Sequence, residues 1–194
     1  MINKLIVAVV SLVVGVAAHA APIVKLTPSS STVIVGSSFT VDIEIDTVTD
    51  LYAWEMDIGF GPTSLVNVTG QAEGPFLGAP TSFFLPGTVD NVVGTITYIA
   101  NSLVGAIPGV TGSGTLATLT FDALSVGLAD FSFSRVLMLD SNLSDIFTDS
   151  QVDWIGGRIE IVSTPTTQVP VPPTLALLGL TLPMVWRLRR RRAG

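Results

Sequence analysis

The stretch Phe39-Thr-Val-Asp-Ile-Glu-Ile-Asp46 alternates apolar and polar side chains without a break. In an extended chain this period of two turns one set of side chains toward a core and the other toward water. The stretch Tyr52–Phe60 repeats the pattern, with Ala53, Glu55, Asp57 and Gly59 between its large apolar residues. Its apolar face is expected to carry Tyr52, Trp54, Met56, Ile58 and Phe60. Two such stretches predict β-strands that each bury one face.

The rest of the central region also reads as short strands. We expect them at Ile23–Leu26, Thr32–Val35, Val93–Ala100, Leu116–Ala123, Phe131–Met138 and Arg158–Val162. Turn residues separate them, at Gly36-Ser37, Gly61-Pro62, Gly87, Gly112-Ser113-Gly114, Gly127 and Gly156-Gly157. Many short strands with Gly and Pro between them are typical of an all-β sandwich or barrel. We therefore predict one all-β domain over residues 21–163.

The first twenty residues have the features of a secretory signal peptide. Lys4 precedes an apolar run, and the run ends in Ala18-His19-Ala20 before Ala21-Pro22. A charged start, an apolar centre and small residues at the exit are what signal peptidase reads. We expect residues 1–20 to be removed after Ala20, with Ala18 and Ala20 as the recognition residues. A retained transmembrane anchor is the alternative, although the run is short for the ~20 residues of a membrane span.

Cleavage would remove the only histidine, and the chain has no cysteine. Disulfides, thiol-based zinc sites, thiol nucleophiles and Ser-His-Asp relays are therefore excluded. No catalytic residue is predicted. The remaining enzymatic alternative is a glycoside hydrolase, which needs only two carboxylates at a suitable separation.

The predicted domain is strongly acidic. All fifteen Asp and Glu lie between Ala21 and Gln168, where Lys25, Arg135 and Arg158 are the only basic residues. Such a domain repels nucleic acid, so we expect no nucleic-acid partner. The acidity serves solubility and also suits calcium or basic partners.

A different composition begins after Val162. Residues 164–173 are rich in proline, which favours an extended linker. The apolar run Thr174–Trp186 follows, and then Arg187, Arg189, Arg190, Arg191 and Arg192. A helix over this run would cover about 20 Å of a hydrocarbon core of about 30 Å. We expect residues 174–194 to form a hydrophobic membrane helix with a cytoplasmic, arginine-rich tail, so that the domain faces outward.

The order of these elements resembles the PEP-CTERM sorting signal of Gram-negative bacteria. The motif would be Val169, Pro170, Val171, Pro172 and Pro173, with Val171 where the family has glutamate. The resemblance implies processing by an exosortase-like enzyme in bacteria that make extracellular polysaccharide. It implies transient anchoring in the inner membrane, then a place on the cell surface, in the outer envelope or in the extracellular matrix. A plain stop-transfer anchor is the alternative.

The domain itself is similar to cohesin domains. The similarity lies in Val35–Val41, Leu51–Leu65, Gly112–Ala123, Leu139-Asp140 and Gly157–Ile161. It implies a single β-sandwich of the jelly-roll type that carbohydrate-binding modules also use. Cohesins bind dockerin modules in cellulose-degrading assemblies. The expected function is a non-catalytic, exported surface module that binds extracellular polysaccharide or matrix. The alternatives are a dockerin-binding type of protein adhesion and an unrecognised carboxylate-based glycoside hydrolase.

No cofactor is predicted, with one candidate metal site. Asp140, Asn142 and Asp145 offer the hard oxygen ligands that calcium uses. They lack the glycine and distal glutamate of an EF-hand loop, so solvated turn acids are the alternative. For Trp154 and Phe83-Phe84, which fall near turns, we expect burial, because large aromatic residues dominate sandwich cores.

Overall fold

The computed structural model describes residues 22–78, 81–146 and 153–165. The predicted signal peptide, the sorting motif and the C-terminal helix with its arginines lie outside these residues. Within the described ranges no helix is long and apolar enough to cross a bilayer. The chain divides into two compact units, residues 1–163 and 164–194, and all of the described strands belong to the first.

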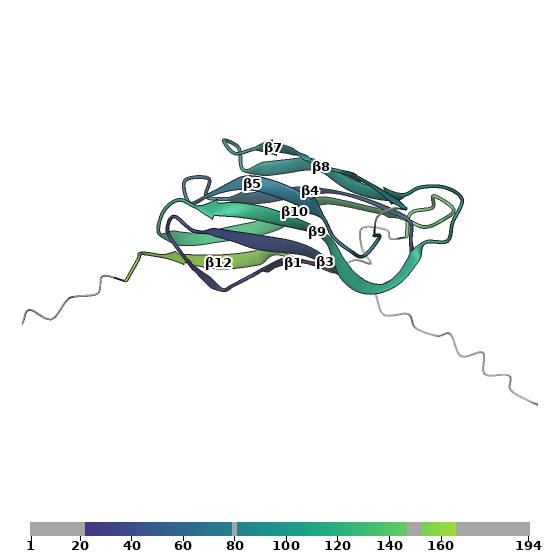
Figure 1. The fold of residues 1–194 in the computed structure, drawn as a ribbon, viewed down its shortest axis with the longest axis horizontal. Helices are drawn as coiled ribbons and strands as arrows, with labels where there is room; N and C mark the ends of the chain where they lie inside the picture. The colour runs from purple at the N-terminus through teal and green to yellow at the C-terminus, as the bar shows by residue number, and fades with distance from the viewer. Residues whose placement is uncertain (1–21, 79–80, 147–152, 166–194) are drawn as a thin grey trace, which may run out of the picture. The chain divides into compact units, whose positions relative to one another are not determined.

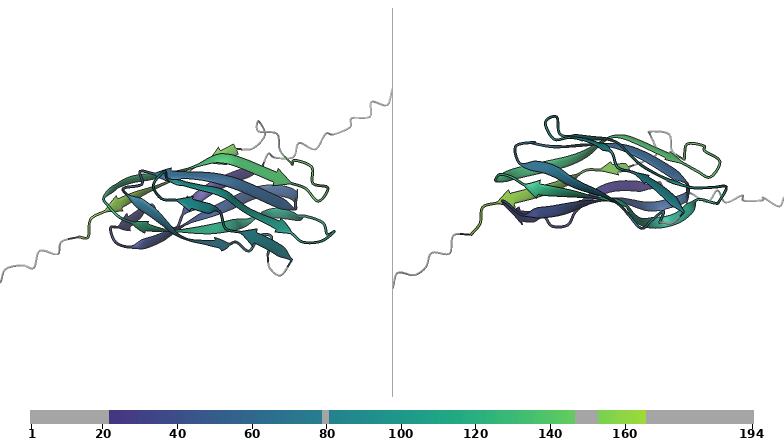
Figure 2. Two further views of the ribbon diagram at one scale, coloured as in Figure 1. Left: turned by 90° about the horizontal axis from the view of Figure 1, so that it is seen from above. Right: turned by 45° about the horizontal axis from the view of Figure 1, so that its top comes forward.

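The first unit is a sandwich of two β-sheets, seen as two stacked layers in Figures 1 and 2. Sheet A has the order β11 (Asp153–Ile155), β1 (Ile23–Pro28), β3 (Ser38–Leu51), β9 (Val110–Ala123) and β5 (Val66–Glu73). Sheet B has the order β2 (Thr32–Ile34), β12 (Gly157–Val162), β10 (Gly127–Leu139), β4 (Ala53–Gly61), β8 (Thr95–Leu103) and β6 (Ser82–Leu85). A short strand, β7 (Thr88–Asp90), also pairs with β8. The predicted all-β sandwich is confirmed.

The two alternating stretches became central strands of opposite sheets. Strand β3 lies between β1 and β9, and β4 lies between β10 and β8. Their inward side chains meet in one core: Val41, Ile43, Ile45, Trp54, Met56 and Ile58 are all buried. Tyr52 is only half-buried, because it connects the two strands, and its hydroxyl donates to the Gly105 carbonyl at 2.6 Å. A sequence without cysteine thus holds its sheets together by apolar burial.

Four phenylalanines form the centre of the core toward one end of the sandwich. The Phe121 ring lies 4.9 Å from Phe131, 5.5 Å from Phe60 and 5.6 Å from Phe39, measured between centroids. These residues come from β9, β10, β4 and β3, so the cluster joins both sheets. Edge-to-face and stacked rings at these separations add to the stabilisation from area burial.

The chain crosses from sheet A to sheet B near both ends of the domain, between β1 and β2 and again between β11 and β12. Strand β11 pairs with β1 in sheet A, and β12 pairs with β2 in sheet B, both in parallel. The Val162 carbonyl accepts the Val35 N–H at 2.9 Å, at the end of the sandwich where β10 begins. The described chain therefore leaves the sandwich after Val162 at the end remote from Leu139, where β10 finishes.

Several local predictions were wrong. Gly112-Ser113-Gly114, predicted as a turn, lies inside β9, where Gly112 has a φ of 135° and the register with β3 shifts. Glycine permits such a bulge without ending the strand. Phe83 and Trp154 are exposed rather than buried, while Phe84 is half-buried and packs near Trp54. Strands β5, β6, β7 and β11 were not predicted, because they are short or lose their alternation.

Candidate interaction surface

The outer face of β6, β8, β4 and β10 carries two cross-strand rows of mostly apolar side chains. The first row runs Leu139, Ala53, Ser102 and Phe83. The second runs Leu137, Glu55, Ala100 and Leu85. In both rows bulky residues stand on the outer strands, and small residues, with Glu55 as the exception, occupy the two middle strands.

This arrangement of sizes makes a trough. Its volume is about 210 Å³, and its walls include Phe83, Leu85, Leu137 and Leu139 above a floor of Ala53 and Ala100. Phe83 is 65% exposed and Leu85 is 48% exposed. A contiguous exposed apolar surface with a hollow is the kind of feature that marks interaction sites on soluble domains.

A bulge in β10 creates the outer wall of the trough. The register with β4 shifts between Phe133, opposite Ile58, and Arg135, opposite Asp57. The shift reverses which side of β10 faces the core. Met138 is therefore buried, while Leu137 and Leu139 point outward beside Glu55 and Ala53.

A carboxylate from the opposite sheet holds the other wall in place. The Glu73 carboxylate on β5 accepts hydrogen bonds from the Ser82 hydroxyl and, at 2.8 Å, from Asn101 Nδ2. Ser82 begins β6, and Asn101 is a buried polar residue of β8. This link fixes the short strand that carries Phe83 and Leu85. The sequence contains no local signal for it, because the three residues are far apart in the chain.

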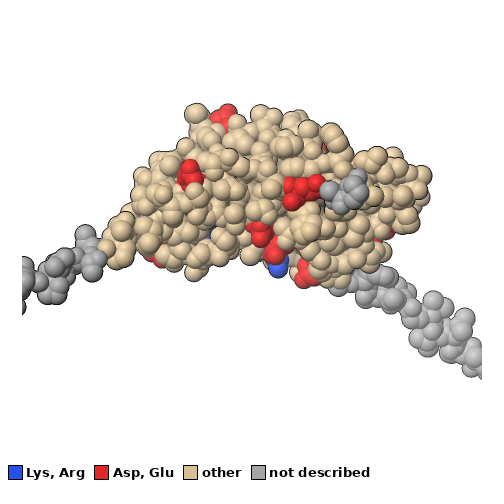
Figure 3. Space-filling model, viewed as in Figure 1, with Lys and Arg blue, Asp and Glu red and all other residues tan. Residues whose placement is uncertain are grey.

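The polar margin of the trough is acidic and aromatic. Arg135 pairs with Glu55, and Asp57 Oδ1 accepts the Tyr98 N–H at 2.7 Å. Every basic residue in the described part of the chain is paired: Lys25 with Glu44 at 3.3 Å, Arg135 with Glu55 and Arg158 with Asp130. The excess charge is therefore negative. The face in Figure 3 accordingly shows scattered red and little blue.

Loops at the trough end of the sandwich are tied together by Asp50. Its Oδ1 accepts the Gly109 N–H at 2.7 Å, and its Oδ2 accepts the Ser141 hydroxyl at 2.7 Å. These hydrogen bonds, that from Ser141 foremost, hold the pKa of Asp50 below its usual value. Asp50 has a φ of 58°, so one carboxylate fixes a strained corner and two loops.

The predicted calcium ligands lie in one of these loops. Asp140 Oδ1 accepts the N–H groups of Asn142 and Ser144 at 2.8 and 2.9 Å, which is the role of a turn acid. Asp145 lies in the same loop and is exposed. Across the described ranges no three His, Cys, Asp or Glu side chains gather as a possible metal site. Calcium binding here stays a prediction.

The fold and its exposed trough define a β-sandwich module with a surface suited to a partner. The profile of the family described as Cohesin domain matches residues 24–153 of the 194. The chain belongs to this family, as the resemblance of its motifs indicated.

Solved structures agree on the fold. The second type II cohesin module of an adaptor scaffoldin from Acetivibrio cellulolyticus superposes with a TM-score of 0.64 at 14% identity, covering 79% of this chain and 98% of that one. A non-cellulosomal cohesin from Archaeoglobus fulgidus superposes with a TM-score of 0.59 at 16% identity, covering 74% of this chain and 93% of that one. A chain of a type I cohesin–dockerin complex from Clostridium thermocellum superposes with a TM-score of 0.57 at 14% identity, covering 72% of this chain and 99% of that one. No curated protein matches the chain significantly.

Proposed function

We propose that this chain is a non-catalytic protein-binding module that takes up a dockerin-type partner on the outer face of β6, β8, β4 and β10. The trough is the observation that carries the proposal, since it combines exposed apolar walls with a floor of small residues. Family membership supports the choice of partner, and one similar solved structure is itself a cohesin–dockerin complex. The two carboxylates nearest the trough contact Arg135 and the Tyr98 N–H, which favours recognition over hydrolysis.

We further propose that the module works outside the cell. The signal-peptide features of residues 1–20 support export, and the Val169–Pro173 motif with its apolar run and arginines supports exosortase-type sorting. In this proposal the C-terminal segment holds the sandwich at the inner membrane until it is processed. The mature domain then resides on the cell surface or in the matrix.

The test is binding of the purified sandwich to a panel of type I and type II dockerin modules. Ala100→Arg fills the trough with a long charged side chain and should abolish binding. Leu128→Arg is the matched control: it adds the same charge on β10, and Leu128 is exposed at the opposite end of the sheet. No binding by the wild type to any module, or equal binding by the two variants, would overturn the proposal.

Polysaccharide binding is the second candidate, because Phe83 and Tyr98 expose aromatic rings on the same sheet. Sugars stack on such rings, and extracellular glycans are present where the chain is proposed to reside. A glycan array with the wild type and Phe83→Ala tests it. Glycan binding that Phe83→Ala removes, without dockerin binding, would replace the first proposal with this one.

A further inference from the structure

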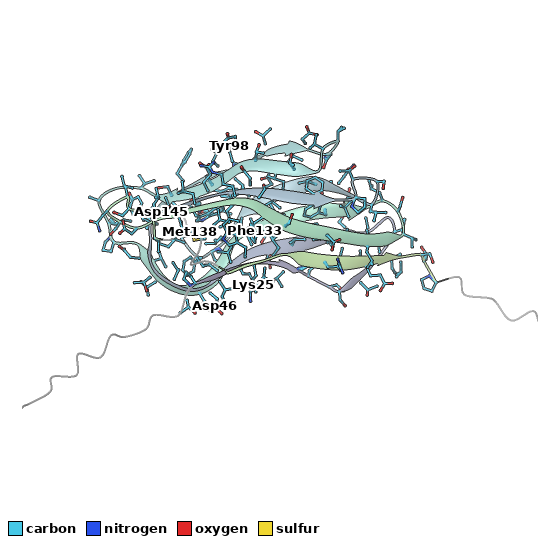
Figure 4. The ribbon with its side chains drawn as sticks, turned by 180° about the vertical axis from the view of Figure 1, so that it is seen from behind. Lys25, Asp46, Tyr98, Phe133, Met138 and Asp145 are labelled. Carbon is cyan, nitrogen blue, oxygen red and sulfur yellow. The ribbon has the colours of Figure 1, made fainter. Side chains whose placement is uncertain are left out.

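A third cross-strand row lies next to the trough and differs from the other two. Arg135 on β10 stands opposite Asp57 on β4. On the other side of Asp57, β8 has a bulge: Met56 pairs with Ile99 and Ile58 with Ile96, so β8 has an extra residue in this interval. The bulge sets Tyr98 at a φ of 60° and leaves its side chain 58% exposed. Figure 4 shows Tyr98 at the surface of its layer, with Lys25 and Asp46 on the other layer. A non-glycine residue in this conformation is unfavourable unless its surroundings hold it there.

Asp57 carries a charge that the described part of the chain does not neutralise. Its Oδ1 accepts the Tyr98 N–H, and its Oδ2 has no partner among the described residues. Arg135, the nearest basic residue by register, pairs with Glu55 instead. Lys25 and Arg158 are paired elsewhere. Glu55, Asp57 and Arg135 together therefore present one uncompensated negative charge beside an exposed tyrosine ring.

We infer, resting on the proposed function, that the partner inserts a lysine or arginine between the Tyr98 ring and the Asp57 carboxylate. An apolar side chain of the same partner segment fills the trough. A cation is attracted both by the face of an aromatic ring and by a carboxylate. This pairing gives the partner a chemical signature, which is one apolar and one basic side chain on the same face.

The distance between the two features fits a helix. Asp57 lies two residues along β4 from Glu55, which lines the trough, and two residues of strand span about 7 Å. Side chains three or four positions apart on a helix are separated by about 5–6 Å. A partner helix with its apolar and basic residues one turn apart therefore reaches both features at once.

The experiment uses the dockerin module that the wild type binds best. Asp57→Asn removes the charge but keeps an oxygen that can accept the Tyr98 N–H. We expect it to weaken binding roughly tenfold and to reduce the fall in affinity between low and high salt. Asp122→Asn is the control, because Asp122 accepts one hydrogen bond, from Ser38, on sheet A. It makes the same change of net charge and should leave affinity and salt dependence unchanged.

Two further variants separate the ring and the partner. Tyr98→Asn removes the ring with a residue that tolerates positive φ, and it should weaken binding severalfold without lowering stability. Asp57→Lys should abolish binding, and changing the partner's basic residue to glutamate should restore it. Equal binding by Asp57→Asn and Asp122→Asn, with Ala100→Arg still inactive, would overturn this inference alone. Unchanged binding by Ala100→Arg would overturn the proposed binding face itself.

Discussion

The side-chain amide of Gln71 pairs with the backbone of Gly87 as a neighbouring strand would. Gln71 Nε2 donates to the Gly87 carbonyl at 2.9 Å, and the Gly87 N–H donates to Gln71 Oε1 at 2.9 Å. Asn91 makes the same double contact with Val68, at 2.8 and 3.2 Å. Strand β5 is an edge of sheet A, and these amides connect it to the residues that flank β7, a short strand of sheet B. Side chains thus cover a strand edge that would otherwise be open to pairing with other chains.

Gln71→Leu should therefore destabilise the sandwich. It leaves the Gly87 N–H and carbonyl without their partner, which costs about 1–3 kcal/mol. Gln71→Glu retains an acceptor for the N–H and should lose less. Urea unfolding at neutral pH measures both, and a leucine variant as stable as the wild type would show that the pairing contributes nothing.

The Asp50 carboxylate should make stability depend on pH. Its pKa is lowered in the folded state by hydrogen bonds from Ser141 and Gly109. A lowered pKa gives stability that is present above the ordinary value of 3.8 and is lost as the pH falls below it. The gap in urea midpoint between wild type and Asp50→Asn should therefore narrow in acid. A gap that is the same at neutral pH and at the lowest pH where both variants fold would contradict this account.

Gly109 should tolerate no larger residue at the same corner. A Cβ built there would lie 2.5 Å from the Asp50 carbonyl oxygen, and backbone atoms cannot give way as a flexible side chain can. Gly109→Ala should lower the unfolding temperature by several degrees, about 1–3 kcal/mol at this domain size. Gly105→Ala in the same loop tests a different effect, because its added Cβ meets no atom within 4 Å but its φ of 99° disfavours any side chain. Gly109 has no φ in the left-handed region, so a loss of stability there reports the contact with Asp50, and a Gly109→Ala variant as stable as the wild type would contradict the clash.

Phe121 should be the most costly of the core aromatics to remove. Its ring contacts Phe39, Phe60 and Phe131 and joins both sheets. Phe121→Ala should cost about 3–5 kcal/mol, a large share of a typical domain stability of about 5–15 kcal/mol. Phe83→Ala, at an exposed position, should cost far less. Calorimetry of the pair tests this, and equal losses would contradict it.

Processing of the tail should depend on its proline motif. Replacing Pro170 and Pro172 with alanine removes the motif but leaves the apolar run and the arginines. The variant should still enter the membrane and should keep its full C-terminus, as intact mass and fractionation would show. Equal processing of variant and wild type would reject the exosortase hypothesis in favour of a plain anchor.

The sequence was sufficient for the sheets but not for the trough. Unbroken alternation in Phe39–Asp46 and Trp54–Phe60 predicted both central strands, because burial on one face enforces a period of two. Strand β10 was also predicted, but simple alternation from Phe131 and Phe133 would have put Leu137 in the core. The bulge before Arg135 reverses that order, and it depends on pairing with β4. The position of β6 depends on an equally non-local contact, the hydrogen bond from the Ser82 hydroxyl to the Glu73 carboxylate, and Phe83 follows Ser82 on that strand.

The place where the described chain leaves the sandwich has a mechanical consequence. Val162 pairs beside the start of β10, whereas the trough lies about 30 Å further along that strand, near Leu137 and Leu139. A load between a partner held in the trough and an attachment at the C-terminus would run lengthwise along the strands. Strand β12 would then be pulled in shear against β10 and β2, so that its hydrogen bonds share the force instead of opening one after another.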